Sequence, residues 1–173
     1  MGTHPHGGGP DASAVGSRHE LAFARQSGVN FLTTGALAAV RQRLAAPERF
    51  QMLKEDRLWA DLLSSMPMCF NLFGELAVDS ITAQQAVNVW WPDAPRGAVQ
   101  VRFEHSPGRR DPTFLGNQSA FDVAFEIDTG DGTRAIVGVE TKYHEHAAKE
   151  GPPKPAALER YVEVTERSGA FTA

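Results

Sequence analysis

The sequence lacks the cysteines needed for a disulfide framework, because Cys69 is the only one. The first ten residues are rich in Gly, His and Pro and lack the basic flank and apolar stretch of a secretory signal. Both features favour a reducing, cytoplasmic location. Cys69 lies between Met68 and Phe70 in an apolar run, which favours a buried side chain over a catalytic thiol.

Long apolar runs and an excess of basic residues are also missing. No stretch approaches the roughly 20 apolar residues that cross a bilayer, so we expect no membrane partner. The formal net charge is −4, whereas domains that bind nucleic acid often carry a basic surplus. An enzyme that binds DNA through a local basic surface and metal ions remains compatible with this charge.

The length of 173 residues fits one domain, which we place at 19–173 after a flexible tail at 1–18. Within it, Ala, Leu, Arg, Gln and Glu at helical spacing predict helices over 19–77. Alternating apolar residues predict a sheet with a hairpin over 85–142. A C-terminal helix is expected over 155–168.

The hairpin is the most informative part of the chain. Apolar residues alternate with polar ones from Phe121 to Asp128, a Gly-rich turn follows at 129–132, and a second strand-like run reaches Thr141. If the chain turns around Asp131, residues whose numbers sum to about 262 lie opposite one another, secure to about one position. Asp122 and Glu140 then become cross-strand neighbours, with Cβ atoms about 5 Å apart.

Lys142 is two residues beyond Glu140 and therefore projects from the same strand face. An Asp opposed to a Glu is destabilising without a compensating cation, and Lys142 supplies only one charge. A hard metal ion bound by oxygens would supply the rest. The alternative is an ordinary hairpin face with solvated side chains, which spacing alone favours because Glu-x-Lys is a very common pattern.

A wider resemblance changes that balance. The hairpin resembles the Asp…Glu-x-Lys signature of the PD-(D/E)XK nuclease superfamily, with Phe121-Asp122 in place of Pro-Asp. From about residue 57 onward the chain also resembles a bacterial family of restriction-endonuclease-like proteins. The segments that carry this resemblance are Ser64-Ser65, Cys69–Gly74, Phe103–Gly108, Gly116-Asn117 and Glu140–Glu145.

The resemblance implies an α/β (α+β) fold with a restriction-endonuclease-like αβββαβ core around a central mixed sheet, preceded by N-terminal helices. Residues 64–77 would form the first helix, 99–104 the first strand, the hairpin the next two strands and 155–168 the following helix. Little sequence follows that helix, which leaves little room for the closing strand of this core.

The same resemblance implies the roles of the site residues. Asp122 and Glu140, with the main-chain carbonyl of Thr141, would bind one or two Mg²⁺ ions beside the scissile phosphate, and Mn²⁺ would substitute. Lys142 would orient the attacking water or neutralise charge in the transition state. Glu75 matches the place of an additional acidic residue in many superfamily members, although a plain helix-surface Glu fits equally well.

Other residues are weaker candidates. Glu104 could join the site from the first strand. Arg109 and Arg110 lie in a loop where they could contact phosphates, but loop arginines are more often simply solvated. Asn117 could bind nucleic acid or shape the site, and a local turn is the favoured reading.

These observations lead to two functional hypotheses. The first is metal-dependent endonuclease cleavage of DNA phosphodiester bonds in restriction or phage defence. The second is a non-catalytic nuclease-like domain that binds DNA or a protein partner. A homodimer would supply the two sites needed to cut two strands, but no interface is recognisable in the sequence.

Overall fold

A computed structural model describes residues 17–143 and 151–169, and these fall into two compact units. The first unit comprises 17–105 and 121–143, and the second comprises 106–120 and 151–169. Each unit is described by itself. Residues 1–16 of the predicted tail lie outside the described residues.

The last two residues of the predicted tail are held in place, which corrects its boundary. Arg18 pairs with Asp61 in an isolated β-bridge, and its Nε lies 3.0 Å from Asp61 Oδ1. Ser17 O accepts a hydrogen bond of 2.9 Å from Leu62 N. These backbone pairings fix a segment whose composition alone indicated flexibility.

The helices predicted over 19–77 are present as four separate elements. Thr33 and Ser64 cap the two longest of them, since each side chain accepts a hydrogen bond from a backbone N–H of the first turn. The elements are α1 (Leu21–Ser27), α2 (Thr34–Ala45), α3 (Glu55–Ala60) and α4 (Ser65–Val78).

Residues 85–90, which we predicted to belong to the sheet, instead form the end of α5 (Ser80–Trp90), so that part of the prediction is wrong. The Asp79 side chain accepts hydrogen bonds from Ile81 N and Thr82 N and so starts the helix. Ala83 and Val87, one turn apart, are both buried. Capping and burial at helical spacing outweigh the strand preference of Val and Trp.

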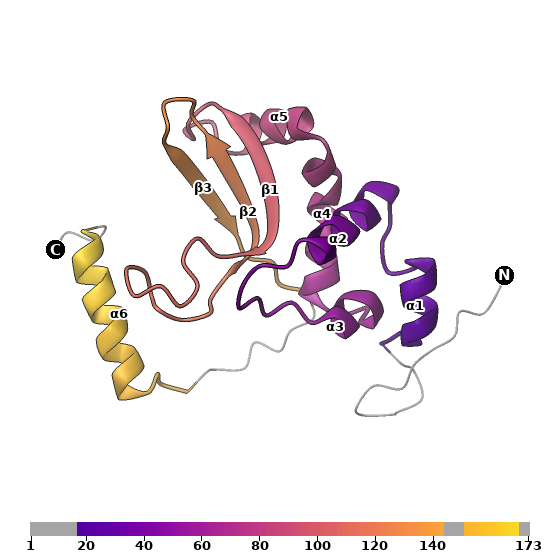
Figure 1. Cartoon of the computed structure of the whole chain (residues 1–173), viewed down its shortest axis with the longest axis horizontal. Coiled ribbons are helices and arrows are strands. Elements are labelled where there is room, and N and C mark those ends of the chain that lie inside the picture. The colour runs from indigo at the N-terminus through magenta and orange to yellow at the C-terminus, as the bar shows by residue number, and fades with distance from the viewer. Residues whose placement is uncertain (1–16, 144–150, 170–173) are drawn as a thin grey trace. The chain divides into compact units, whose positions relative to one another are not determined.

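Three antiparallel strands follow in the order β1-β2-β3, namely β1 (Ala98–His105), β2 (Phe121–Asp128) and β3 (Arg134–Val139). The expected sequence of a helix and three strands is confirmed, with α5 inserted between α4 and β1 (Figure 1). Residues 17–143 and 151–169 contain no fourth strand that would make the sheet mixed.

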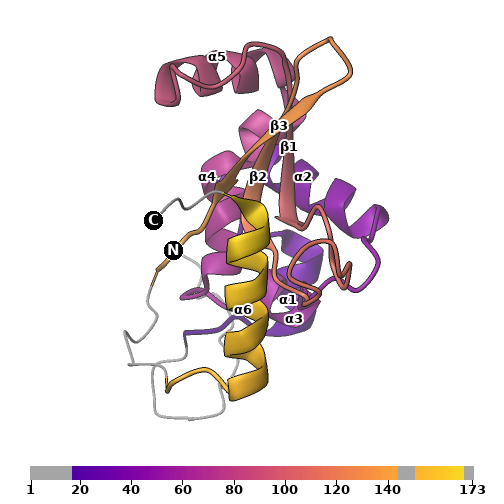
Figure 2. The same ribbon diagram turned by 90° about the vertical axis from the view of Figure 1, so that its left-hand side faces the viewer.

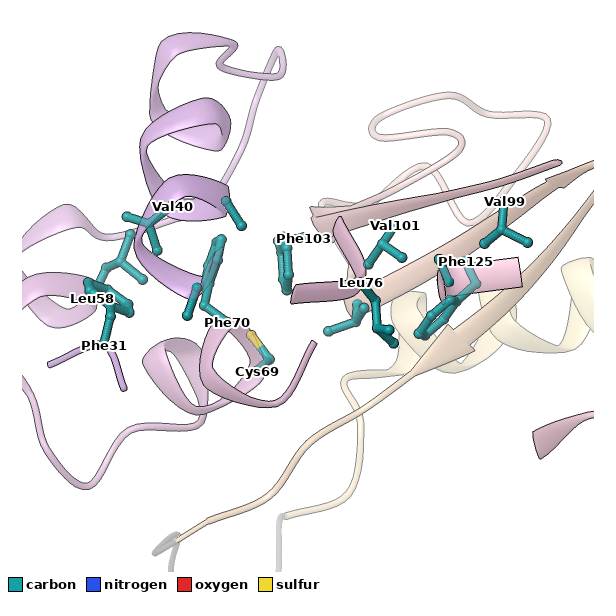
Figure 3. Packing of buried hydrophobic residues seen from close by; sticks show 14 of the residues in the cluster. Phe31, Val40, Leu58, Cys69, Phe70, Leu76, Val99, Val101, Phe103 and Phe125 are labelled. Atoms are coloured by element: carbon teal, nitrogen blue, oxygen red, sulfur yellow. The ribbon is translucent and has the colours of Figure 1, made fainter. Parts of the chain in front are cut away.

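Within the first unit, α4 and α5 pack on the sheet and α2 packs on α4. Both views show α5 at the end of the sheet that carries the β2–β3 turn (Figures 1 and 2). Phe70 of α4 stacks on Phe103 of β1 with ring centroids 3.9 Å apart (Figure 3). Gly74 allows the close crossing of α2 and α4, because an added Cβ would lie 2.5 Å from Ala36 Cα.

The β2–β3 turn is closed by Asp131, which accepts hydrogen bonds from Thr129 Oγ1, Thr133 Oγ1 and Thr133 N. These bonds lower the pKa of the Asp131 carboxyl from 3.8 to about 2. A carboxyl group whose pKa is lower in the folded than in the unfolded chain stabilises the folded chain at pH values above the unfolded pKa. This stabilisation is lost as the pH falls through the folded pKa.

We therefore expect Asp131 to contribute stability above about pH 4 that disappears as the pH falls towards 2. NMR titration of the Asp131 carboxyl carbon would give its folded pKa directly. In Asp131→Asn this acid-labile part of the stability should be missing. An Asp131 pKa near 4 would contradict the arrangement.

The second unit consists of the 106–120 loop and α6 (Pro155–Ser168), whose predicted bounds are confirmed. Arg160 Nη2 donates to Pro112 O at 2.6 Å and to Phe114 O at 2.7 Å. Arg167 Nη2 donates to Thr113 O at 2.9 Å.

In 17–143 and 151–169, no helix is long and apolar enough to cross a membrane.

Candidate active site

The hairpin register predicted from the sequence is confirmed. Val123 pairs with Val139 and Asp128 pairs with Arg134, so opposed residue numbers sum to 262. The paired residues end at Val123 and Val139, so Asp122 and Glu140 are the next residues of their chain segments, at the end of the hairpin away from its turn. The two carboxylates therefore come from adjoining chain segments of a single supersecondary element.

A distortion in β1 turns Glu104 towards this end of the hairpin. Regular alternation would place Glu104 on the face of Arg102, whose Nη1 lies 3.2 Å from Glu126 Oε2. Glu104 has φ +49°, and it is His105 that reaches Glu126 instead, with Nε2 3.0 Å from Oε1. Left-handed residues in strands produce such local reversals, which are frequent beside active sites.

The partner strand β2 changes face at the same level. Regular alternation would place Asp122 on the face of Ala124, which pairs with Gly138. The ring of Phe121 occupies that position, since a Cβ added to Gly138 would come within 2.3 Å of it. Asp122 instead lines a pocket together with Cys69 of α4.

This pocket has a volume of about 230 Å³ and brings three candidate site residues together. Asp122, Lys142 and Glu104 all line it, the last of them a residue that the sequence singled out only weakly. The remaining lining comes from α3, α4 and the chain before α3, and consists of Leu53, Arg57, Ser65, Met66, Cys69 and Phe70. The first unit alone supplies every one of these side chains.

The Asp122 carboxylate is held in one orientation by Thr141. Its Oδ2 accepts a hydrogen bond of 2.8 Å from Thr141 N and one of 2.9 Å from Thr141 Oγ1. Thr141 itself is only 7% exposed. Asp122 is thus tied to the residue between Glu140 and Lys142. The other oxygen of Asp122, Oδ1, accepts neither of these two hydrogen bonds.

Glu140 and Lys142 form an ion pair, with Lys142 Nζ 2.6 Å from Glu140 Oε1. Their side chains are 56% and 64% exposed, so solvent reaches both. The structure therefore brings together the residues of the predicted Asp…Glu-x-Lys pattern. His144 and Glu145, which also carry the resemblance, lie outside the described residues.

Cys69 lines the pocket but is not placed for nucleophilic chemistry. Burial raises the pKa of its thiol, and the negative charges of Asp122 and Glu140 raise it further. The thiol donates to Met66 O at 2.9 Å. The expectation of a buried Cys69 is confirmed (Figure 3).

Glu75, the further candidate on α4, is not among the pocket residues. Its Oε1 accepts a hydrogen bond of 3.1 Å from Gly35 N in the first turn of α2. A carboxylate at this position satisfies an N–H that has no partner within its helix and stabilises the positive end of the helix dipole. The structure supports a structural role for Glu75.

We expect Glu75→Ala to lower the free energy of unfolding by about 1 kcal/mol, the usual effect of losing a helix cap, and to leave the DNA cleavage predicted from the sequence unchanged. Urea unfolding and a cleavage assay on the same preparation would measure both. Glu75→Gln keeps an acceptor oxygen and should recover much of the stability. A loss of cleavage at unchanged stability would instead indicate that Glu75 is one of the catalytic residues.

The residues of the 106–120 loop that we predicted to contact nucleic acid form hydrogen bonds within the second unit. Asn117 O accepts a hydrogen bond of 2.7 Å from Arg110 N, and Asn117 Oδ1 accepts one of 3.0 Å from Ser119 N. Arg109 Nη1 donates to Gln118 O at 3.3 Å. Asn117 therefore forms the local turn that was the favoured reading, and the DNA contacts of Arg109 and Arg110 stay a prediction.

Sequence reasoning missed a buried polar cluster beside β1. Glu48 Oε1 lies 2.8 Å from Arg102 Nη2 and 2.9 Å from His105 Nδ1. Burial opposes ionisation of Glu48, but the hydrogen bond and the charge of His105, with the charges of Arg102 and Arg43, lower its pKa below the usual value. The cluster fixes the chain before α3 to β1, next to the site.

The donor set of the hairpin end fits a divalent cation. Asp122 and Glu140 offer hard carboxylate oxygens, and the Thr141 carbonyl belongs to the same segment. The residues that the structure describes contain no ready cluster of three Asp, Glu, His or Cys side chains able to hold a metal. A cation at this place would therefore draw on main-chain, water or substrate oxygens as well.

Comparison with protein families agrees with the geometry. A family model described as the PD-(D/E)XK nuclease superfamily matches residues 1–173, so the chain belongs to this superfamily. Its α/β fold with a three-stranded antiparallel sheet is of the restriction-endonuclease-like kind. Members are usually nucleases and generally use divalent metals. No curated protein and no solved structure gave a significant match.

Proposed function

We propose that the protein is an endonuclease that hydrolyses phosphodiester bonds of DNA with Mg²⁺ as its cofactor, for which Mn²⁺ can substitute. The observation that carries the proposal is the pocket that gathers Asp122, Lys142 and Glu104, with Asp122 tied to Thr141. Superfamily membership supports the reaction class.

In this proposal Asp122 and Glu140, together with the Thr141 carbonyl, would hold the cation. When bound, the cation supplies Lewis-acid polarisation of the scissile phosphate. The two hydrogen bonds from Thr141 fix Asp122 before any ligand arrives, so little reorganisation is needed on binding.

Lys142 acts on the charge that develops at the phosphate. Its ammonium group can donate to a phosphoryl oxygen or orient the attacking water, and its 64% exposure leaves it reachable. The ion pair with Glu140 keeps the two side chains together at the end of the hairpin.

The resemblance to bacterial restriction-endonuclease-like proteins supports a role in restriction or phage defence in the cytoplasm. A homodimer would bring two sites to one duplex, and this expectation stays a prediction. The alternative function, a non-catalytic domain that binds DNA or a protein, differs in one respect: it does not require a cation held by Asp122.

Thermal unfolding with increasing Mg²⁺ separates these functions. A ligand at 100 times its Kd stabilises the folded state by about 2.7 kcal/mol, so the unfolding midpoint should rise with Mg²⁺. In Asp122→Ala this metal-dependent rise should vanish, whatever the starting midpoint. A rise that persists unchanged in Asp122→Ala, or no rise together with no cleavage in the unaltered protein, would contradict the proposal.

A further inference from the structure

The chain between α2 and α3 forms one wall of the site. We define residues 47–54 as the rim loop. Leu53 lines the pocket, and Met52 N donates a hydrogen bond of 3.1 Å to Glu104 Oε1. Glu48, at the other end of the loop, is fixed by Arg102 and His105. The rim loop is thus anchored at both ends to β1, beside the candidate catalytic residues.

Each of the two segments that this contact joins, the rim loop and β1, contains one residue with an unusual backbone conformation. Phe50 has φ +61° and Glu104 has φ +49°, although neither residue is glycine. Left-handed conformations at bulky residues are costly and persist only where surrounding contacts enforce them. Such strain clusters at active sites and ligand clamps, which marks the rim loop as a candidate for binding.

The rim loop carries two cations without carboxylate partners. The Arg49 guanidinium lies 4.5 Å from the centre of the Phe50 ring, and Arg49 is exposed. Neither Arg49 nor the exposed Lys54 forms an ion pair within 17–143 and 151–169. The neighbouring Arg57 differs, because its Nε lies 3.7 Å from Asp61 Oδ2 and its Nη2 donates to Ser64.

We propose that the rim loop is a binding site for the phosphate backbone of DNA, with Arg49 and Lys54 as the contacting residues and Glu104 as a positioning residue. This inference rests on the proposed nuclease function and names the surface that holds its substrate. Arginine presents a planar fork that matches phosphate geometry, and lysine supplies a point charge. The negative overall charge of the chain is then no obstacle, since the rim loop, whose Leu53 lines the pocket, carries two exposed cations without carboxylate partners.

The anchoring of the loop explains why Glu104 is a carboxylate. Its Oε1 holds Met52 N, and its Oε2 lies 3.5 Å from Arg43 Nη2 in an ion pair whose side chains are 8% and 15% exposed. One oxygen of Glu104 thus holds the rim loop, and the other holds Arg43 of α2. A loop ordered before binding loses less conformational entropy when it binds its ligand.

The test measures DNA binding at several salt concentrations in a Glu140→Ala background, which suppresses cleavage. Each phosphate contact contributes about 0.9 to the slope of log affinity against log salt on duplex DNA, and about 0.7 on a single strand. Arg49→Ala with Lys54→Ala should therefore lower the slope by roughly 1.8 on duplex and 1.4 on single-stranded oligonucleotides.

Arg134→Ala is the matched control. Arg134 is exposed and forms no ion pair in the part of the chain that the structure describes, but it lies at the turn end of β3, about 20 Å along the strand from Glu140. It should leave the slope unchanged. An unchanged slope in the double variant, or an equal fall in Arg134→Ala, would overturn the rim-loop proposal.

These outcomes are distinguishable from failure of the proposed function. If the unaltered protein cuts DNA but the rim-loop variants bind with the unaltered slope, only the rim-loop proposal fails. If the unaltered protein neither binds nor cuts DNA, the proposed function fails and the rim-loop proposal fails with it.

Discussion

Replacing Lys142 by Ala should lower the rate of DNA cleavage by about 100- to 1,000-fold, the usual effect of removing one preorganised group that stabilises transition-state charge. Glu140→Ala should lower it at least as much, because Glu140 is a proposed oxygen ligand of the cation. Single-turnover cleavage of a labelled duplex would measure both rates.

Stability should change little in the same variants. The side chains of Glu140 and Lys142 are 56% and 64% exposed, and exposed substitutions usually alter the free energy of unfolding by less than about 0.5 kcal/mol. Arg134→Ala, a charge removed from the other end of β3, is the control and should cut at the unaltered rate. Cleavage by Lys142→Ala at the unaltered rate would remove Lys142 from the mechanism.

Replacing Phe125 by Ala should lower the free energy of unfolding by about 3–5 kcal/mol, because truncation leaves a cavity as well as losing apolar burial. Phe125 is 0% exposed on the central strand β2. Its ring centroid lies 5.3 Å from that of Trp91 and 5.8 Å from that of Phe73, so it joins the sheet to the helical side of the core.

Urea unfolding followed by circular dichroism and by Trp fluorescence would measure this loss. Leu72→Ala is a suitable control, because Leu72 is 59% exposed on α4 and its truncation should change the stability by less than about 0.5 kcal/mol. Equal losses in the two variants would contradict the placement of Phe125 at the centre of the core.

The hairpin could be predicted because its information is local. Alternation from Phe121 to Asp128 and the Gly-rich turn fix the strands, and the turn position fixes which residues oppose one another. The same arithmetic predicts that Asp122 and Glu140 follow the last pair of the register, Val123 and Val139. Helix α6 was predictable for the same kind of reason, since Pro155 stands at its start and Gly169 directly after its end.

The errors arise where tertiary contacts outweigh local preference. Val87, Val89 and Trp90 have strand-forming side chains, yet capping by Asp79 and burial of Ala83 and Val87 make this segment a helix. A different limit concerns Glu75, whose possible site role stays a prediction: its carboxylate accepts a hydrogen bond from Gly35 N, 40 positions away in the sequence. No single-sequence pattern contains that contact.

Glu104 shows the clearest limit of sequence reasoning about the site. Strict alternation assigns it to the face of Arg102, and only its left-handed backbone turns it towards Asp122 and Lys142. A positive φ at Glu carries no sequence signal, because the conformation is disfavoured for this residue type. The surrounding contacts enforce it.

The most direct test of the central claim is cleavage of a mixed pool of plasmid, linear and single-stranded DNA with Mg²⁺, with Mn²⁺ and with neither ion. The unaltered protein is compared with Glu140→Ala and Lys142→Ala. The account predicts metal-dependent cleavage by the unaltered protein that is lost in both variants. Absence of cleavage by a folded protein shown to bind the metal, or equal cleavage by the variants, would contradict it.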